Sequence, residues 1–229
     1  GVLRSRSGAL SGILNGIDTA LWDPAGDPHL AERYDASTLE KKHINKRALQ
    51  RRLNLEPSDD PLVGFVGRFT QQKGADLVAA AAAELAALPA QIALLGRGER
   101  IIEGALATAA ARHPGRIGVS IGFSEELAHL IEAGADLFLM PSRFEPCGLN
   151  QMYSQRYGTP PVARATGGLA DTIVDGETGF LFETDFLDAV RRALAAYREP
   201  ARWREIQRAG MLRDFSWDAA ARRYADLYG

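Results

Sequence analysis

Short apolar runs alternate with longer mixed segments along most of this 229-residue chain. Runs that are almost wholly apolar are typical of strands buried on both faces of a parallel sheet. Six of them predict strands: residues 62–67, 91–96, 116–121, 135–140, 159–163 and 179–182. Helical patterns lie between and after them, at residues 73–88, 99–112, 124–133, a segment ending near 157, 185–198, 200–213 and 217–228. Ser124 is the expected N-cap of its helix.

The alternation of strand and helix predicts the fold class. Strands separated by helices at this spacing form a parallel sheet that is wrapped on both faces. We therefore expect an α/β protein with a doubly wound, Rossmann-like sheet over residues 61–229. Residues 1–60 lack the regular pattern and are predicted to be irregular, apart from a polar helix at 36–53. The chain has no initiator Met, so we expect a fragment or an excised domain.

Composition narrows the class of protein further. The chain is 46% hydrophobic and 24% charged, which suits one large globular domain or two small ones. A net charge of -2 favours neither nucleic acid nor a membrane surface as partner. No apolar run approaches the roughly 20 residues of a membrane span. The single cysteine, Cys147, excludes an internal disulfide and fits a reducing cytosol.

Residues 142–151 carry the most informative chemistry. They follow a predicted strand and lead into a helix, and ligands of open α/β sheets bind beyond the carboxyl ends of strands. Glu145 is suited to accept hydrogen bonds from sugar hydroxyls or to stabilise developing positive charge. The backbone N–H groups from Cys147 to Gln151 are suited to phosphate. The alternative is that Glu145 only caps the helix and Cys147 is a small buried hydrophobe.

A second motif holds two cations. Arg68 and Lys73 follow the strand at 62–67 and lie five residues apart, in a loop at the carboxyl edge of the predicted sheet. Two cations that converge there suit a diphosphate, whose leaving charge they neutralise. The alternative is a solvated surface loop.

Three weaker signals also follow predicted strands. Phe123 is suited to stack on a base or to pack in the core, and the sequence alone favours the core. Gly167 and Gly168 permit a close backbone approach to a ligand. The Gly-Arg-Gly at 96–98 lacks the third glycine of a dinucleotide fingerprint, which favours a plain tight turn.

Metal and hydrolase chemistry find no support in the sequence. The four histidines are scattered, without the spacing of a metal site, and we expect them to be surface or helix residues: His29, His43, His113 and His129. No nucleophile elbow or Ser-His-Asp order is visible.

The motifs together resemble those of bacterial glycogen synthase and plant starch synthase. The segments that carry the resemblance cover almost the whole chain in order: NGID (15–18), WDP (22–24), GFVGRFTQQKG (64–74), PSRFEPCGLNQ (141–151), TGGLADT (166–172) and FSWD (215–218). The resemblance implies the C-terminal, nucleotide-sugar-binding half of a two-domain GT-B glycosyltransferase. Its terminal helix would cross back to the N-terminal half, which is missing here.

The resemblance also implies an activity. Members of this family are retaining glucosyltransferases that transfer glucose from ADP-glucose to the non-reducing end of an α-1,4-glucan. No metal ion or other cofactor is expected, and the location would be the cytoplasm, or the plastid stroma for a plant protein. The isolated fragment is expected to be inactive.

Roles are carried over residue by residue. Arg68 and Lys73 would hold the donor diphosphate, and Phe123 stands where the family has an aromatic residue beside the adenine. Glu145 would contact the donor glucose and, with the two cations, matter for catalysis. The remaining expected donor-binding residues line the phosphate and ribose pocket or lie near the sugar: Cys147, Gly148, Leu149, Thr166 and Gly167.

The sequence departs from the wider pattern in one place and leaves alternatives open. Related glycosyltransferases often carry a second Glu eight residues after the first, where this chain has Tyr153. The starch synthase branch also lacks this second Glu. The family's Lys-x-Gly-Gly loop and acceptor-binding residues belong to the missing half. The alternatives are a glycosyltransferase that uses a UDP- or GDP-sugar, an isolated nucleotide-binding module without activity, and a structural remnant.

Overall fold

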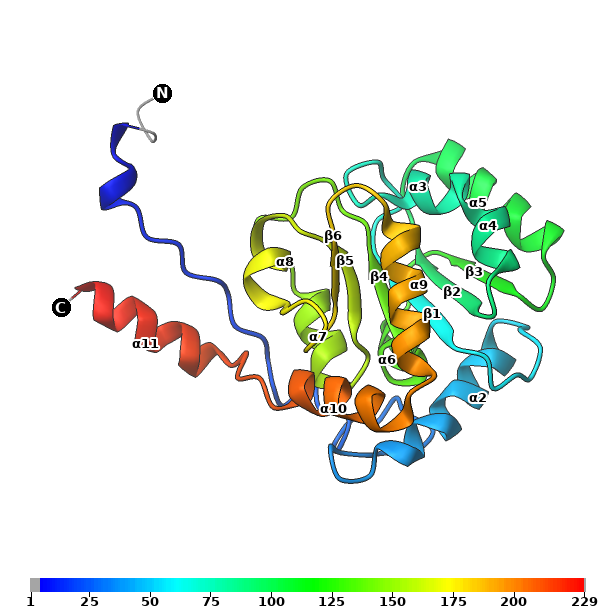
Figure 1. Cartoon of the computed structure of the whole chain (residues 1–229), viewed down its shortest axis with the longest axis horizontal. Helices are drawn as coiled ribbons and strands as arrows, with labels where there is room; N and C mark the ends of the chain where they lie inside the picture. The colour runs from blue at the N-terminus through cyan, green and yellow to red at the C-terminus, as the bar shows by residue number, and fades with distance from the viewer. Residues whose placement is uncertain (1–4, 229) are drawn as a thin grey trace.

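The computed structural model describes residues 5–228 and contains a six-stranded parallel sheet (Figure 1). The strands are β1 (Leu62–Val66), β2 (Gln91–Gly96), β3 (Ile117–Ile121), β4 (Leu137–Met140), β5 (Pro161–Arg164) and β6 (Phe180–Phe182). Their order is β3-β2-β1-β4-β5-β6, and every neighbouring pair is parallel. The predicted doubly wound sheet is confirmed. Residues 1–4 and 229, which belong to the predicted domain ranges, lie outside the described residues.

Helices cover both faces of this sheet (Figure 1). The helices of the described chain are the 3₁₀ helices η1 (Ser7–Ala9) and η2 (Leu39–Lys41), and α2 (Lys42–Arg52), α3 (Ala75–Ala80), α4 (Ala82–Ala87), α5 (Arg100–Arg112), α6 (Glu125–Gly134), α7 (Asn150–Arg156), α8 (Gly167–Thr172), α9 (Phe186–Tyr197), α10 (Pro200–Met211) and α11 (Trp217–Tyr228); η1 and α11 lie away from the sheet. One apolar core joins the sheet to α3, α4, α5, α9 and α10. A second core joins it to α2, α6 and α8. No helix within residues 5–228 is long and apolar enough to cross a lipid bilayer.

Local sequence explains where two of these helices begin. The Ser124 side chain accepts a hydrogen bond from the Leu127 backbone N–H at 3.2 Å, so the predicted N-cap of α6 is confirmed. Asp185 caps α9 in the same way, through the N–H groups of Leu187 and Asp188. Both caps satisfy donors that have no partner inside the helix.

The predicted helix at 73–88 is wrong as a single element. α3 begins only at Ala75, because Gly74 has a φ of +74° and the chain turns there. The helix then breaks at Ala81 and resumes as α4. The break contains neither glycine nor proline, and nothing in the structure explains it.

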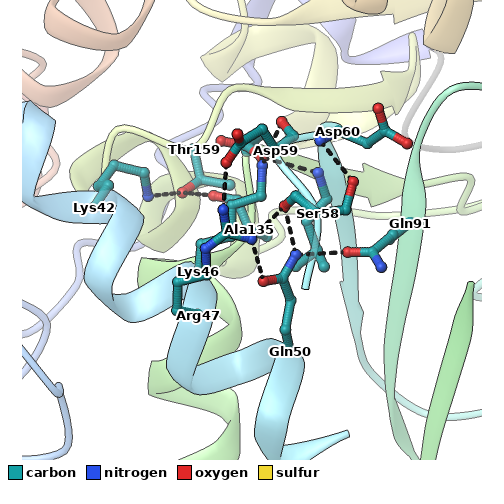
Figure 2. Close-up of polar contacts among 12 residues, drawn as sticks. Lys42, Lys46, Arg47, Gln50, Ser58, Asp59, Asp60, Gln91, Ala135 and Thr159 are labelled. Atoms are coloured by element: carbon teal, nitrogen blue, oxygen red, sulfur yellow. Dashed lines mark hydrogen bonds and ion pairs between the residues drawn. The ribbon is translucent and has the colours of Figure 1, made fainter. Parts of the chain in front are cut away.

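The predicted polar helix at 36–53 is shorter than expected, since only η2 and α2 are helical there. α2 packs on α6 and is fastened to the amino ends of the strands by polar side chains (Figure 2). Lys46 lies 2.8 Å from Asp136 Oδ2, and Gln50 donates to Gln91 Oε1 at 2.7 Å. The Asp136 carboxylate also accepts the Leu62 N–H at 2.9 Å, directly at the start of β1.

The two ends of the described chain leave the sheet together. The segment before Ile17 and helix α11 both project away from the rest of the molecule (Figure 1). They meet where the Ile17 N–H donates to the Phe215 carbonyl at 2.8 Å, in a parallel bridge between Ile17 and Ser216. Gly16 is required beside this bridge, because a methyl group there would overlap the backbone of Trp217.

Candidate functional site: the crevice between β1 and β4

The strand order places two of the predicted motifs side by side. β1 and β4 are neighbours in the sheet, although two strands and their helices separate them in the chain. The direction of winding reverses between them, and the crevice at such a switch point is where open α/β sheets bind ligands. The loop after β1 carries Arg68 and Lys73, and the loop after β4 carries Glu145 and Cys147.

Lys73 and Glu145 form an ion pair that joins the loops after β1 and β4. The Lys73 ammonium contacts Glu145 Oε2, and the Ser142 hydroxyl donates to the same oxygen at 3.3 Å. The Glu145 side chain is only 8% exposed and that of Lys73 is 25% exposed. A nearly buried carboxylate needs such a partner, because burial of an unpaired charge is costly. The alternative in which Glu145 caps α7 is wrong, since the helix begins at Asn150 without a side-chain cap.

Arg68 lies in the same loop as Lys73 but remains exposed to solvent. Its guanidinium donates to Gln72 Oε1 at 3.1 Å. A single neutral side chain holds it weakly, so the group is available to an anion. The crevice therefore presents one exposed cation and one cation that is paired with a carboxylate.

The backbone after Glu145 passes closely against the start of α8. The Gly168 N–H donates to the Glu145 carbonyl at 3.0 Å, and a methyl group on Gly168 would overlap the Cys147 carbonyl oxygen. Gly167 has a φ of +48°, and a methyl group there would overlap the Glu145 carbonyl. The close approach predicted for this glycine pair is thus made to the chain's own backbone. It brings Thr166, the residue before α8, to the border of the same loop.

The loop from Cys147 to Leu149 leaves several donors open. Within residues 5–228, the backbone N–H groups of Cys147, Gly148 and Leu149 make no hydrogen bond to the protein. Gly148 adopts a φ of +71°, which favours glycine. Cys147 is half-buried, not a fully buried hydrophobe. Free N–H groups in a turn before a helix attract anions.

Phe123 corrects a prediction. The side chain is 90% exposed just beyond β3, so the sequence-based preference for a core position is wrong. Gly122 before it has a φ of +147°, and the chain turns outward after β3. An aromatic ring left in solvent at this edge of the sheet remains free to stack on a ligand.

The Gly-Arg-Gly turn at 96–98 is structural, as the sequence favoured. A methyl group on Gly96 would overlap the Gly67 carbonyl oxygen, and one on Gly98 would overlap that of Phe69. The Phe69 N–H donates to the Arg97 carbonyl at 3.0 Å. These glycines let the loops after β1 and β2 pack together.

Two residues inside the quoted motifs were not predicted to matter. Gln72 accepts from Arg68 and donates to the Phe144 carbonyl at 3.3 Å, so it bridges the two loops. Asn150 donates to the Val66 carbonyl at 2.8 Å and ties the start of α7 to the end of β1. Their signal in the sequence was only that they lie within the two motifs that follow β1 and β4.

The Tyr153 ring is stacked on another aromatic ring and is not left open to a ligand. It stacks on Trp22 at 3.8 Å, and Trp22 stacks on His129 at 3.9 Å. His129 lies on α6 as a helix residue but is fully buried, with Nδ1 2.7 Å from Asp27 Oδ2. The side chain that replaces a second Glu in this chain therefore anchors the N-terminal segment to α7.

The site shows no metal-like grouping among the described residues. Within residues 5–228, no three His, Cys, Asp or Glu side chains gather as they would around a metal ion. The expectation that no metal is needed remains a prediction.

Known proteins share both the sequence and this fold. Residues 46–209 match the family model of glycosyl transferases group 1. The glycogen synthase of Alkalilimnicola ehrlichii is 54% identical over the whole chain, which covers 50% of that protein. The catalytic domain of starch synthase IV from Arabidopsis thaliana, solved with ADP and acarbose, is 37% identical with a TM-score of 0.91; the match covers 99% of this chain and 50% of that one.

A more distant structure, a sucrose-phosphate synthase from Thermosynechococcus elongatus, is 28% identical with a TM-score of 0.70 and covers 99% of this chain and 54% of that one. The chain spans about half the length of the curated relatives it matches. The family model covers most of the chain, and the relatives match it from end to end. This chain belongs to the glycosyl transferases group 1 family, and within it is similar to the glycogen synthases.

Proposed function

We propose that this chain is the donor-binding, C-terminal half of a retaining glucosyltransferase of the glycogen synthase type. The complete enzyme transfers glucose from ADP-glucose to the non-reducing 4-hydroxyl of an α-1,4-glucan. The observation that carries this proposal is the Lys73–Glu145 pair at the switch point between β1 and β4, beside the exposed Arg68. Similarity to glycogen synthases along the whole chain supports it.

The cations act on the leaving group. In the reaction, the bond between glucose C1 and the diphosphate oxygen breaks, and ADP leaves as an anion. Arg68 and Lys73 neutralise that charge, helped by the free backbone N–H groups of Cys147, Gly148 and Leu149. Because the protein supplies this positive charge, we expect turnover without added metal.

Glu145 acts on the sugar. When the diphosphate draws Lys73 away, the buried Glu145 carboxylate needs new donors, and the hydroxyl groups of the donor glucose supply them. The acceptor 4-hydroxyl forms the new bond to C1 on the face from which ADP departs, and its proton passes to the leaving phosphate. The configuration at C1 is therefore retained.

The remaining site residues border the donor. Phe123 stacks on the adenine from its exposed position after β3. Thr166 and Gly167 lie beside the Glu145 backbone and are proposed to face the sugar. We expect the reaction to run in the cytoplasm, since the similar glycogen synthases are bacterial proteins.

The acceptor site requires a second half. Apolar side chains are exposed along the projecting segments, including Leu10 at 54%, Trp217 at 52% and Leu227 at 54%. We infer that the N-terminal half of the enzyme packs against α11 and closes over the crevice. The present chain alone should bind ADP weakly and transfer no glucose.

The first test measures glucosyl transfer from ADP-glucose by the full-length protein. Glu145→Ala and Arg68→Ala should each lower kcat by about 10²- to 10³-fold, the usual cost of removing one group that stabilises transition-state charge. The control is Glu177→Ala, an exposed carboxylate in the turn before β6, which should leave kcat unchanged. A kcat near that of the wild type in either site variant would refute its assigned role.

The second test identifies the donor by calorimetry on this chain with ADP, UDP and GDP. Preferential binding of ADP supports the proposed donor, whereas preference for UDP or GDP would assign the site to another nucleotide sugar. Glucose transfer by the chain alone would refute the two-half arrangement. Absence of binding by any nucleotide would favour a structural remnant.

A further inference from the structure

Arg143 joins the two loops that form the crevice. It lies in the loop after β4, and its guanidinium makes a two-pronged contact with Asp76 at the start of α3, with distances of 2.7 and 2.8 Å. The same guanidinium donates to the Gln71 carbonyl, and the Arg143 backbone N–H donates to the Gln72 carbonyl at 2.9 Å. A single residue of one loop therefore holds two residues of the other loop and the first turn of α3.

These contacts surround the pair at the centre of the site. Lys73 lies between the held residues Gln72 and Asp76, and Glu145 follows two residues after Arg143. The loops touch closely nearby, because a methyl group on Gly74 would overlap the Pro141 carbonyl oxygen. Arg143 therefore fastens the two segments on either side of the Lys73–Glu145 pair.

Arg143 is placed for geometry more than for folding stability. Its side chain is 42% exposed, and that of Asp76 is 29% exposed. Exposed ion pairs contribute little to stability, but a planar guanidinium that binds a carboxylate with two parallel hydrogen bonds restricts orientation strongly. Lysine lacks this fork and would keep only the charge. The Arg143 contact also lowers the pKa of the Asp76 carboxyl, as expected of a well-formed pair.

We propose that Arg143 is a positioning residue for glucosyl transfer, which together with Asp76 keeps the loops after β1 and β4 in register so that Lys73 meets the diphosphate while Glu145 meets the glucose. This inference rests on the proposed function of the same crevice. It matters most when the donor is bound, because the diphosphate then competes with Glu145 for Lys73 and the direct link between the loops weakens. The Arg143–Asp76 contact lies outside that exchange and persists.

The test compares kcat and KM for ADP-glucose in the full-length protein. Arg143→Ala should lower kcat by about 10- to 100-fold, the scale of a displacement of about 1 Å in a catalytic group, with a smaller change in KM. Asp76→Ala should have a similar effect. The double variant should lose no more than the worse single variant, because the two side chains act as one unit. Arg143→Lys should resemble Arg143→Ala more than the wild type.

The chain offers a matched control. One guanidinium nitrogen of Arg192 on α9 lies 3.2 Å from both carboxylate oxygens of Asp175, and the other terminal nitrogen donates to the Leu181 carbonyl. Arg192 thus joins a carboxylate and a carbonyl around β6 as Arg143 does between its loops, but without two parallel hydrogen bonds. Its side chain is 40% exposed, close to the value for Arg143. Arg192→Ala should leave kcat unchanged and shift the melting temperature by as much as Arg143→Ala does.

Hydrogen exchange supplies a readout that does not depend on activity. Arg143→Ala should accelerate amide exchange in residues 68–76, and Arg192→Ala should not. If kcat of Arg143→Ala stays within about twofold of the wild type, or if Arg143→Ala and Arg192→Ala lose kcat equally, the proposal is overturned. Wild-type protein that transfers no glucose from ADP-glucose would refute the proposed function instead, and unchanged exchange in Arg143→Ala would then still overturn the role of Arg143.

Discussion

At the amino ends of the strands, Lys46 and Asp136 lie 2.8 Å apart with side chains only 8% and 13% exposed, whereas at the carboxyl ends Arg68 touches one glutamine and is otherwise in solvent. At the amino edge of the sheet, the polar side chains form hydrogen bonds and ion pairs with one another (Figure 2). Asp136 Oδ2 accepts from both Lys46 and the Leu62 N–H, and Gln50 is engaged with Gln91. At the opposite edge, Phe123 is 90% exposed.

The difference shows that charge at a sheet edge does not by itself indicate a binding site. The buried contacts at the amino edge fasten α2 to the sheet, and a ligand that bound there would have to break them. A charged side chain that has only one partner, a neutral partner or a shared partner can exchange that partner for a group of the ligand. Lys73 and Glu145 belong to this second kind under the proposed function, in which the donor diphosphate would replace Glu145 and the glucose hydroxyl groups would replace Lys73. Four variants test the distinction.

The largest effect is expected at the amino edge. Asp136→Ala leaves the buried Lys46 ammonium and the Leu62 N–H without their carboxylate, and should lower the free energy of unfolding by about 3 to 5 kcal/mol. ADP affinity of the folded fraction should not change. Urea unfolding and calorimetry measure the two quantities. As a control, Asp59→Ala removes a carboxylate that is 98% exposed, and should cost less than about 1 kcal/mol. An equal loss of unfolding free energy in Asp136→Ala and Asp59→Ala would contradict the distinction between the two edges.

Gly168→Ala should affect stability and binding together. The added methyl group overlaps the Cys147 carbonyl oxygen and pushes the loop away from α8, at a cost of about 1 to 3 kcal/mol in the free energy of unfolding. ADP affinity should fall as well, because the same loop carries the free N–H groups. Gly104→Ala is the matched control: it adds a methyl group to open space within α5 and should stabilise by about 0.5 to 1 kcal/mol. An unchanged ADP affinity in Gly168→Ala would show that the contact of α8 with this loop does not contribute to the site.

Phe123→Ala should weaken binding without affecting the fold. The ring buries almost no surface in the free protein, so the free energy of unfolding should change by less than about 0.5 kcal/mol. Loss of stacking on the adenine should cost about 0.5 to 1.5 kcal/mol of ADP affinity, measured by calorimetry. Ile101→Ala, at a side chain that is 88% exposed on α5, should change neither quantity. An unchanged ADP affinity in Phe123→Ala would remove this residue from the site.

The smallest effect concerns pH. The hydrogen bonds from Arg143 hold the pKa of Asp76 below its usual value of 3.8. A carboxyl whose pKa is lowered by folding stabilises the folded state above pH 3.8 and loses that contribution as the pH falls through its folded pKa. The pair is partly exposed, so wild type and Arg143→Ala should differ by only about 0.2 to 1 kcal/mol in unfolding free energy at neutral pH. The difference should shrink below pH 3.8; a difference that grows there would contradict the assigned pairing.

Much of the fold was predictable because its signals are local. Each buried strand is a short apolar run between turn residues, and every one of the six predicted runs overlaps a strand, although β5 (Pro161–Arg164) begins and ends later than the predicted 159–163. Ser124 was recognisable as an N-cap because a hydroxyl side chain needs only the next turn of its own helix. The break at Ala81 was not predictable, since alanine favours helix on both sides of it.

The candidate site was only partly predictable. Glu145, Arg68 and Lys73 were identified because charged residues follow strands there, but the pairing of Lys73 with Glu145 joins two distant loops. The contact of Lys73 with Glu145 spans 72 residues, and that of Arg143 with Asp76 spans 67. The exposure of Phe123 depends on how the chain turns after β3, which residue type alone does not determine. The predicted domain ranges and the roles of the site residues remain predictions.

By itself, the sequence determined the class of sheet, the order of strands and helices along the chain, and the chemistry available at each strand end, because periodicity and residue type act over a few neighbouring residues. Only the tertiary structure decided which strand ends meet. The order β3-β2-β1-β4-β5-β6 brings the loop after β1 against the loop after β4, and thereby pairs Lys73 with Glu145. Charged groups at two strand ends become one site only when long-range packing of the sheet holds them within a few ångströms, where electrostatic interaction is strong.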